Sequence, residues 1–199
     1  GFMKDAFVLC GITLVAGALL GGVYEMTKAP IDAANLAAKE AAYRTVFPDA
    51  ASFDAGDLAD KIPAANEEIA GLGKVMVDEA VAASDASGAA AGYVVTATSN
   101  DGFGGAITVS VGIQSDGTVN GIEFLTLAET AGLGMRANTD AFKDQFKDKN
   151  VDKFEYTKTG ATADDQIDAL SGATITTNAM TNGVNAGLCA FQYEKGGNQ

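Results

Sequence analysis

The sequence predicts an α+β fold, an antiparallel sheet with flanking helices, preceded by one N-terminal transmembrane helix. Three observations support this fold class. The stretch from residue 6 to residue 24 contains no charged side chain. Several strand-like segments follow, and two of them are joined by the turn Asp116-Gly117. A helix with one apolar face comes last. Strands followed by helices, without regular alternation, favour α+β over α/β.

The apolar run over residues 6–24 is bracketed by Lys4-Asp5 and by Glu25. At ~1.5 Å per residue, a helix of this length crosses a hydrocarbon core of ~30 Å. A cleaved signal peptide is the alternative, but the run exceeds a typical signal core and lacks a clear small-residue cleavage pattern. We therefore expect residues 1–28 to be a single-pass anchor in the cell (inner) membrane. Lys4 and the short N-terminal flank predict that the soluble domain lies on the extracytoplasmic side.

The composition limits the functions that the chain can perform. It carries 13 basic and 26 acidic side chains in 199 residues, and the net charge of −13 argues against binding to nucleic acid. There is no His, which is the commonest general base and metal ligand. The two cysteines, Cys10 and Cys189, are too few for a thiolate cluster and are expected to be packing residues. We expect no catalytic residue and no metal site, so redox chemistry would need a bound cofactor.

Residues 29–71 are expected to be a helical linker and the start of the soluble domain. The Ala-rich segment 31–46 continues the anchor helix and ends before Phe47-Pro48. The main domain covers residues 72–199. Its first strands are expected at 74–77, 93–98, 106–113 and 119–127, with a loop over 82–91.

The C-terminal part of the domain is expected to contain two helices and one further strand. A helix over 140–147 would have Thr139 as its N-cap, and residues 151–157 would form the strand. The last helix covers 174–191, because apolar residues recur there every three or four positions. These residues are Met180, Val184, Leu188 and Phe191. The Gly-rich link 101–105 either lets a ligand approach the backbone or is a flexible connector.

The tetrapeptide [S/T]-G-A-T occurs twice, at residues 159–162 and 171–174. The first copy leads into Ala163-Asp164-Asp165, where two carboxylates would repel an anion. The second copy leads directly into the last helix, whose unpaired N–H groups and dipole favour a phosphate. Its Gly and Ala are small enough for close approach of the backbone. The residues alone leave another interpretation open, in which Ser171 only caps the helix.

The second copy belongs to a longer motif, Asp168-Ala169-Leu170-Ser171-Gly172-Ala173-Thr174. This motif resembles the D-x-x-[S/T]-G-A-T flavinylation motif of FMN-binding domains in the RnfG and NqrC families. The first copy has Tyr156 where the motif has Asp, so Thr162 is not expected to react. The resemblance implies that an ApbE-type FMN transferase joins the Thr174 hydroxyl to the phosphate of FMN as a phosphoester.

A second motif, Glu129-Thr130-Ala131-Gly132-Leu133-Gly134, looks like the E-T-P-G-L-G of the same families, with Ala131 in place of Pro. A His often found just upstream is absent, with Leu127 near its place. The resemblance implies that this loop forms a wall of the isoalloxazine site and that Asp168 serves recognition or metal binding during attachment. The implied cofactor-binding set is Asp168, Ser171, Gly172, Ala173, Thr174 and Thr176, with Glu129, Thr130, Gly132, Leu133 and Gly134.

The resemblance implies a membrane-anchored electron-transfer subunit of the Rnf complex, a ferredoxin:NAD oxidoreductase coupled to Na⁺ or H⁺ translocation. Such a chain is a subunit of an oxidoreductase and translocase and is not catalytic alone. Its implied partners are the other membrane subunits, including the second covalent-flavin subunit RnfD, and the transferase during maturation. Two alternatives remain, an NqrC-like subunit of the Na⁺-translocating NADH:quinone reductase and a flavin-free membrane-tethered binding module. The short chain without long insertions favours Rnf.

Overall fold

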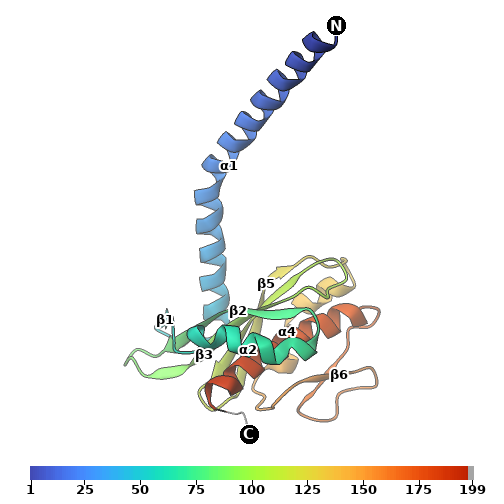
Figure 1. Cartoon of the computed structure of the whole chain (residues 1–199). Helices are drawn as coiled ribbons and strands as arrows, with labels where there is room; N and C mark the ends of the chain where they lie inside the picture. The colour runs from blue at the N-terminus through green and yellow to red at the C-terminus, as the bar shows by residue number, and fades with distance from the viewer. Residues whose placement is uncertain (197–199) are drawn as a thin grey trace. The chain divides into compact units, whose positions relative to one another are not determined.

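The computed structural model describes residues 1–196 and divides them into two compact units, residues 1–40 and a second unit that begins at Ala41. Helix α1 (Phe2–Val46) makes up the first unit and continues into the start of the second. It is long and apolar enough to cross a membrane, with a mean hydropathy of 2.3 over an 18-residue window that is 0% buried. The expected continuation of the anchor helix to Val46 is confirmed (Figure 1).

The second unit is built on a five-stranded sheet whose strands pair antiparallel in chain order. The strands are β1 (Ser52–Asp54), β2 (Val75–Ser84), β3 (Ala90–Ser99), β4 (Ile107–Gln114) and β5 (Val119–Leu127). The predicted hairpin at Asp116-Gly117 is confirmed, since it joins β4 to β5 and Gly117 has a φ of 96°. Asp116 accepts a hydrogen bond from the Thr118 N–H at 2.9 Å, which stabilises the turn.

Strands β2 and β3 are both longer than the sequence predicts. The loop expected over 82–91 is confined to the few residues between Ser84 and Ala90. Ala and Ser have weak strand propensity, which explains why this extension is missed. Here they continue the ladder with β3, and Ala82 stands opposite Tyr93. Pairing with a neighbouring strand therefore overrides local propensity.

The segment 49–71, which carries little sequence signal, contains β1 and three short helices. These are the 3₁₀ helix η1 (Ala59–Lys61), α2 (Ile62–Glu68) and the 3₁₀ helix η2 (Ile69–Leu72). Ala65 of α2 and Ile69 of η2 are buried in the same core as the sheet. Short elements of this kind have too few residues to show a periodic pattern, so their positions depend on packing.

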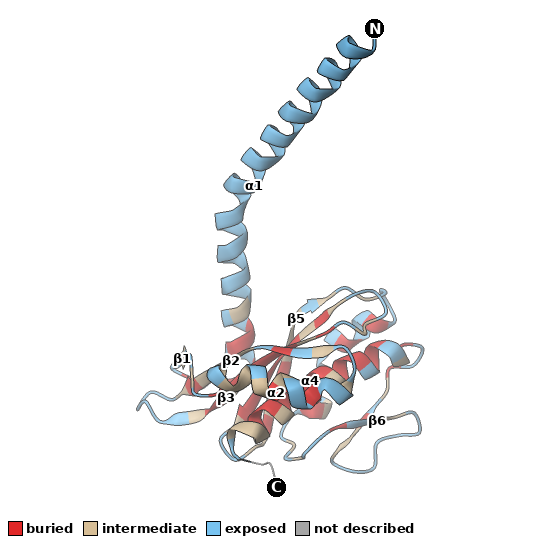
Figure 2. Cartoon of the chain, in the orientation of Figure 1, coloured by how far each residue is buried: buried red, intermediate tan, exposed pale blue. Residues whose placement is uncertain are grey.

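Helix α4 (Thr174–Glu194) lies across one face of the sheet, against β2, β3 and β4. The predicted apolar stripe of this helix is confirmed, because all four of its residues are buried in the core. Figure 2 shows buried residues along α4. Gly183 faces β4 so closely that an added Cβ would lie 3.1 Å from Val109 Cγ1. Cys189 is half-buried beside the stripe, and burial raises the pKa of its thiol above the usual range.

The last turn of α1 and the residues that follow it cover the opposite face of the sheet. Tyr43, Val46 and Phe47 form a second hydrophobic cluster with Ala83 of β2 and Val94 of β3. Val94 and its neighbour in the main core point to opposite faces, as successive strand residues do. The sheet is therefore buried on both sides.

Three short helices follow β5, namely the 3₁₀ helix η3 (Gly134–Asn138), α3 (Asp140–Lys143) and the 3₁₀ helix η4 (Asp144–Phe146). The helix expected over 140–147 is thus one α turn followed by a 3₁₀ turn. Thr139 precedes α3, but its side chain does not cap that helix. Its hydroxyl instead donates to the Arg136 carbonyl at 2.8 Å, and the same carbonyl accepts the Thr139 N–H at 3.2 Å where η3 ends.

The strand expected over 151–157 begins only at its last three residues. Strand β6 (Glu155–Thr157) pairs in parallel with β7 (Gln166–Asp168) as a separate two-stranded sheet. Phe154 cannot join a ladder, because both its backbone groups bond to Asn185 of α4. Its N–H donates to Asn185 Oδ1 at 2.7 Å, and its carbonyl accepts from Nδ2 at 2.9 Å.

The contact between the end of α1 and the sheet predicts a stability change. A Cβ added to Gly112 of β4 would lie 2.8 Å from Val46 Cβ and 3.0 Å from the Val46 carbonyl oxygen. We expect Gly112→Ala to lower the free energy of unfolding by about 1–3 kcal/mol, because overpacking forces the two elements apart. Chemical denaturation measures this change. Gly71→Ala, with nothing within 4 Å of its Cβ, should equal or slightly exceed the parent in stability. Equal stability of the two variants would contradict the prediction.

Candidate functional site

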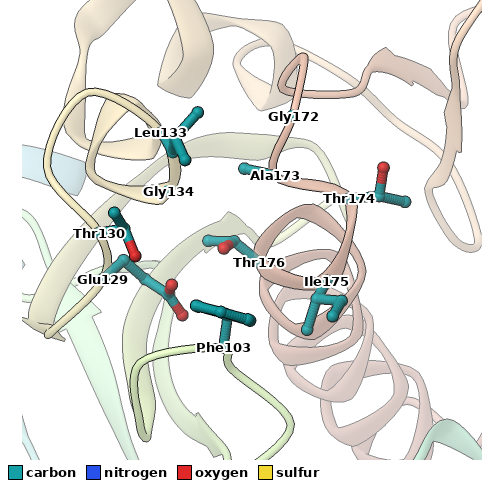
Figure 3. A pocket seen from close by; sticks show the side chains of 10 residues that line it. All are labelled: Phe103, Glu129, Thr130, Leu133, Gly134, Gly172, Ala173, Thr174, Ile175 and Thr176. Carbon is teal, nitrogen blue, oxygen red and sulfur yellow. The ribbon is translucent and has the colours of Figure 1, made fainter.

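A pocket of about 350 Å³ lies at the N-terminal end of α4 and brings the two sequence motifs together. Three segments form it: the loop before β4, the loop after β5 and the start of α4 (Figure 3). The lining residues are Phe103, Glu129, Thr130, Leu133, Gly134, Gly172, Ala173, Thr174, Ile175 and Thr176. Every predicted cofactor-binding residue lines this pocket except Gly132, Asp168 and Ser171.

Helix α4 begins without a side-chain cap. Ala173 is the N-cap residue, with φ −136° and ψ 47°, and no side chain makes a capping hydrogen bond there. The interpretation of Ser171 as the helix cap is therefore wrong, because Ser171 is exposed and lies two residues before the N-cap. The first N–H groups of a helix have no partner within it. Together with the helix dipole, they make this end of the pocket favourable for an anion.

Thr174 is the first residue of α4 and is half-buried at the edge of the pocket. Its side chain is turned away from Glu129 and Thr176 (Figure 3). The turn before it is closed by a hydrogen bond from the Ala173 N–H to the Leu170 carbonyl at 3.0 Å. The small residue within this turn is required by the backbone, since Gly172 has a φ of 77° that other residues rarely adopt.

Glu129 contributes a buried polar atom that lacks a partner. Its Oε1 accepts a hydrogen bond from the Gly104 N–H at 3.2 Å, whereas its buried Oε2 has no partner among the described residues. Gly134 allows this arrangement, because a Cβ there would lie 2.8 Å from Glu129 Oε2 and 2.7 Å from Thr176 Oγ1. A buried acceptor without a donor costs about 1–3 kcal/mol. The carboxylate therefore fits a ligand that brings an N–H or O–H group into the pocket.

Large apolar side chains surround the mouth of the pocket although they are exposed. Phe103 is 69% exposed, Ile175 is 55% exposed and Leu133 is 42% exposed. Three exposed apolar side chains around one cavity fit a ligand with a flat apolar part. Phe103 and Ile175 are absent from the sequence-predicted set, and Ile175 carried no signal beyond its place next to Thr174.

Phe103 could have been found through the glycines on either side of it. A Cβ on Gly102 would lie 2.1 Å from the Gly105 carbonyl oxygen, and one on Gly104 would lie 2.1 Å from the Ala128 carbonyl oxygen. The loop is therefore packed closely against the end of β5, which argues against the flexible connector. The glycines of this loop therefore lie close to the protein's own backbone and not to a ligand. This packing places Phe103 at the pocket.

Asp168 does not line the pocket, and its side chain bonds to the loop between β6 and β7. Its exposed carboxylate accepts a hydrogen bond from the Ala161 N–H at 2.6 Å, and Ala161 belongs to the first [S/T]-G-A-T copy. Its own N–H donates to Gln145 Oε1 at 2.6 Å. Within residues 1–196, no group of three or more His, Cys, Asp or Glu side chains is placed so as to hold a metal ion.

The first [S/T]-G-A-T copy lies in the exposed link between β6 and β7 and not at a helix end. The Thr162 hydroxyl donates to Gln166 Oε1 at 3.2 Å, and the Thr162 N–H donates to the same oxygen at 3.1 Å. The surroundings of Thr162 and Thr174 therefore differ in the way that the flanking sequence predicts. Only the second copy contributes to the pocket.

The fold, the two motifs and the pocket define an FMN-binding domain, and residues 102–188 match the protein family of that description. The G subunit of the Na⁺-translocating ferredoxin:NAD⁺ oxidoreductase complex of Acetobacterium woodii is 31% identical, and the match covers 95% of this chain and 91% of the relative. The G subunit of the ion-translocating oxidoreductase complex of Methanosarcina acetivorans is 31% identical, over 93% of this chain and 92% of the relative. The chain belongs to this family, the G subunits of Rnf complexes.

One solved structure is also similar, that of NqrC from Shewanella oneidensis. It is 23% identical with a TM-score of 0.46, and the match covers 59% of this chain and 60% of that chain.

Proposed function

We propose that the chain is a membrane-anchored electron-transfer subunit of an Rnf complex that carries FMN covalently on Thr174. The observation that carries the proposal is the position of Thr174, which opens an uncapped helix beside a pocket built from both motifs. A phosphate joined to the Thr174 Oγ would lie at the positive end of α4. Membership of the RnfG family and the match to the FMN-binding domain support the same function.

Attachment would be a group transfer onto the Thr174 hydroxyl, catalysed by an ApbE-type transferase. The Oγ forms a bond to the phosphorus of a flavin dinucleotide, and the bond between that phosphorus and the nucleotide leaving group breaks. The hydroxyl proton passes to a base of the transferase. Half-burial at the pocket edge leaves Thr174 open to a second enzyme. The turn formed by Ser171, Gly172 and Ala173 would cradle the phosphate, although Ser171 itself is exposed and does not line the pocket.

The rest of the pocket would hold the flavin ring. Phe103, Leu133 and Ile175 offer apolar surface to a flat ring, and Glu129 Oε2 offers an acceptor to one of its polar groups. When bound, FMN supplies the redox chemistry that no side chain of the pocket can perform. The protein's part is to bind the ring, orient it and exclude water. The chain is therefore part of an oxidoreductase and is not catalytic alone.

The proposed setting is the cell membrane, with α1 as a single-pass anchor and the domain on the extracytoplasmic side. Its partners would be the other membrane subunits of the complex, including RnfD, and the transferase during maturation. The complex would couple electron transfer between ferredoxin and NAD to Na⁺ or H⁺ translocation, as the names of two relatives suggest. The domain boundaries 1–28, 29–71 and 72–199 belong to the same proposal.

The two alternatives are less well supported. An NqrC-like subunit of a quinone reductase would share the motifs, but the relatives that cover the chain almost fully are G subunits of oxidoreductases of the Rnf type. The flavin-free module explains Ser171 only as the cap of the last helix. The N-cap residue of α4 is Ala173, so Ser171 does not have that role. The flavin-free module also leaves the unpartnered Glu129 oxygen inside the pocket unexplained.

The proposal predicts a covalent flavin at Thr174. After co-production with an FMN transferase, the parent and Thr162→Val should gain the mass of one FMN, and their flavin fluorescence should survive denaturation in a gel. Thr174→Val should lose both signals, because it lacks the only hydroxyl that the proposal allows to react. Intact mass spectrometry and in-gel fluorescence measure the outcome. A parent without flavin in the presence of active transferase would refute the proposed function.

Asp168 provides a test of how the motif is recognised. Asp168→Asn removes the charge but keeps an oxygen that can accept the Ala161 N–H, whereas Asp168→Ala removes both. If the charge serves the transferase, both variants should be flavinylated at least about tenfold more slowly, which corresponds to a rise of ~1.4 kcal/mol in the activation barrier. If the hydrogen bond from the Ala161 N–H is what matters, Asp168→Asn should be flavinylated at the normal rate and Asp168→Ala should be flavinylated more slowly. We expect the first result, measured by mass over time, and normal flavinylation of Asp168→Ala would exclude both roles.

Glu129 should influence the redox potential of the flavin. A carboxylate beside the ring disfavours added negative charge, so Glu129→Gln should raise the midpoint potential. Unit charges 4 Å apart interact by about 1 kcal/mol in bulk water and about 4 kcal/mol near a protein surface, so a rise of roughly 40–170 mV is expected for a one-electron step. Spectroelectrochemical titration measures it. Glu155→Gln, whose carboxylate is exposed on β6 and paired with Lys153, is the control and should leave the potential unchanged. Identical potentials for Glu129→Gln and the parent would contradict the prediction.

A further inference from the structure

We propose that Thr177 is a positioning residue for flavin attachment, because its buried hydroxyl joins both ends of the turn that presents Thr174. Thr177 is 0% exposed and does not line the pocket, so it would act only through its neighbours. The inference rests on the proposed function, since it concerns the reactivity of Thr174. The hydrogen bonds that Thr177 makes to the turn can be tested in protein that carries no flavin.

The hydroxyl of Thr177 makes two hydrogen bonds to the flavinylation motif. Its Oγ1 accepts the Leu170 N–H at 3.1 Å and donates to the Ala173 carbonyl at 2.9 Å. Leu170 and Ala173 are also the two residues whose own hydrogen bond, at 3.0 Å, closes the turn. One buried hydroxyl therefore links the first and last residues of this turn.

These bonds determine the position of the reacting residue. Thr174 follows Ala173 directly. The orientation of the peptide between them therefore determines where the Thr174 N–H points and in which direction its side chain leaves the backbone. The Ala173 carbonyl accepts from the Thr177 N–H at 3.0 Å as well as from the Thr177 hydroxyl. This carbonyl is thus held twice at the point where α4 begins. Misplacement of a reacting group by ~1 Å can reduce a rate about 100-fold.

An ordinary helical threonine on the same helix offers a matched control. Thr hydroxyls often bond to the carbonyl four residues earlier, and such bonds need no function. Thr181 does this, donating to the Thr177 carbonyl at 2.7 Å, and it is also buried, at 3% exposure. Thr177 differs because it accepts in addition an N–H from seven residues earlier, within the motif. Replacing each by Val removes a buried hydroxyl, but only one of the two changes touches the turn.

The test compares the parent chain of residues 1–199 with Thr177→Val, Thr177→Ser and Thr181→Val in detergent. Each protein is incubated with a purified ApbE-type transferase and FAD, and FMN attachment is followed by intact mass at a series of acceptor concentrations. We expect Thr177→Val to lower kcat at least about tenfold with little change in KM, because binding survives and alignment is lost. Thr177→Ser should restore most of the rate, since it keeps the hydroxyl. Thr181→Val should match the parent.

Hydrogen exchange supplies a second measurement that needs no variant and no flavin. In the flavin-free parent, the Leu170 amide should exchange as slowly as amides inside α4, and rapid exchange would overturn the proposal. Attachment to Thr177→Val at the rate seen for Thr181→Val would overturn it too, while leaving the proposed function intact. A parent that takes up no FMN although its Leu170 amide is protected would overturn the proposed function, and the attachment role of Thr177 with it.

Discussion

The packing of α4 against the sheet is the constraint on which the pocket depends. The helix lies on β2, β3 and β4, and Gly183 and Gly187 let it approach Val109 and Val111 of β4 closely. Asn185 adds two hydrogen bonds to the backbone before β6. The helix cannot slide along the sheet without losing these contacts. Its first turn is therefore held beside the loops at one edge of the sheet, and the pocket exists because all three meet there.

Close contacts between backbone segments at the pocket fix the two carboxylate oxygens of Glu129 in different surroundings. Gly104 lies against the end of β5 and donates to one oxygen of Glu129, and Gly134 leaves room for the other oxygen beside Thr176. That second oxygen is buried without a donor. Among residues 1–196, the single buried side-chain polar atom without a partner thus lies in the pocket, and such exceptions are common at functional sites.

The sequence predicts those features that depend on local pattern. Alternation marks β4, the Asp-Gly turn marks the hairpin that joins it to β5, and a repeat of three and four residues marks the buried face of α4. The Ala-rich part of β2 depends on pairing with β3 and carries no such pattern. Phe103 enters the site through packing of its loop against β5, and the bond of Asp168 to Ala161 joins the end of β7 to the loop before it. Contacts of this kind arise only once the chain is folded, so the residues alone do not reveal them.

The place of Thr174 at the edge of the pocket has a consequence for how tightly the pocket must hold a ring. A flavin tied there through its phosphate would be confined by a short flexible chain, with an effective concentration of about 1 mM at the pocket. Contacts too weak to retain a free ligand would then suffice. A dissociation constant of about 0.1 mM, roughly −5.5 kcal/mol, would keep the ring docked about nine-tenths of the time. The pocket can therefore remain open at its mouth, with Phe103, Leu133 and Ile175 exposed, and still be occupied.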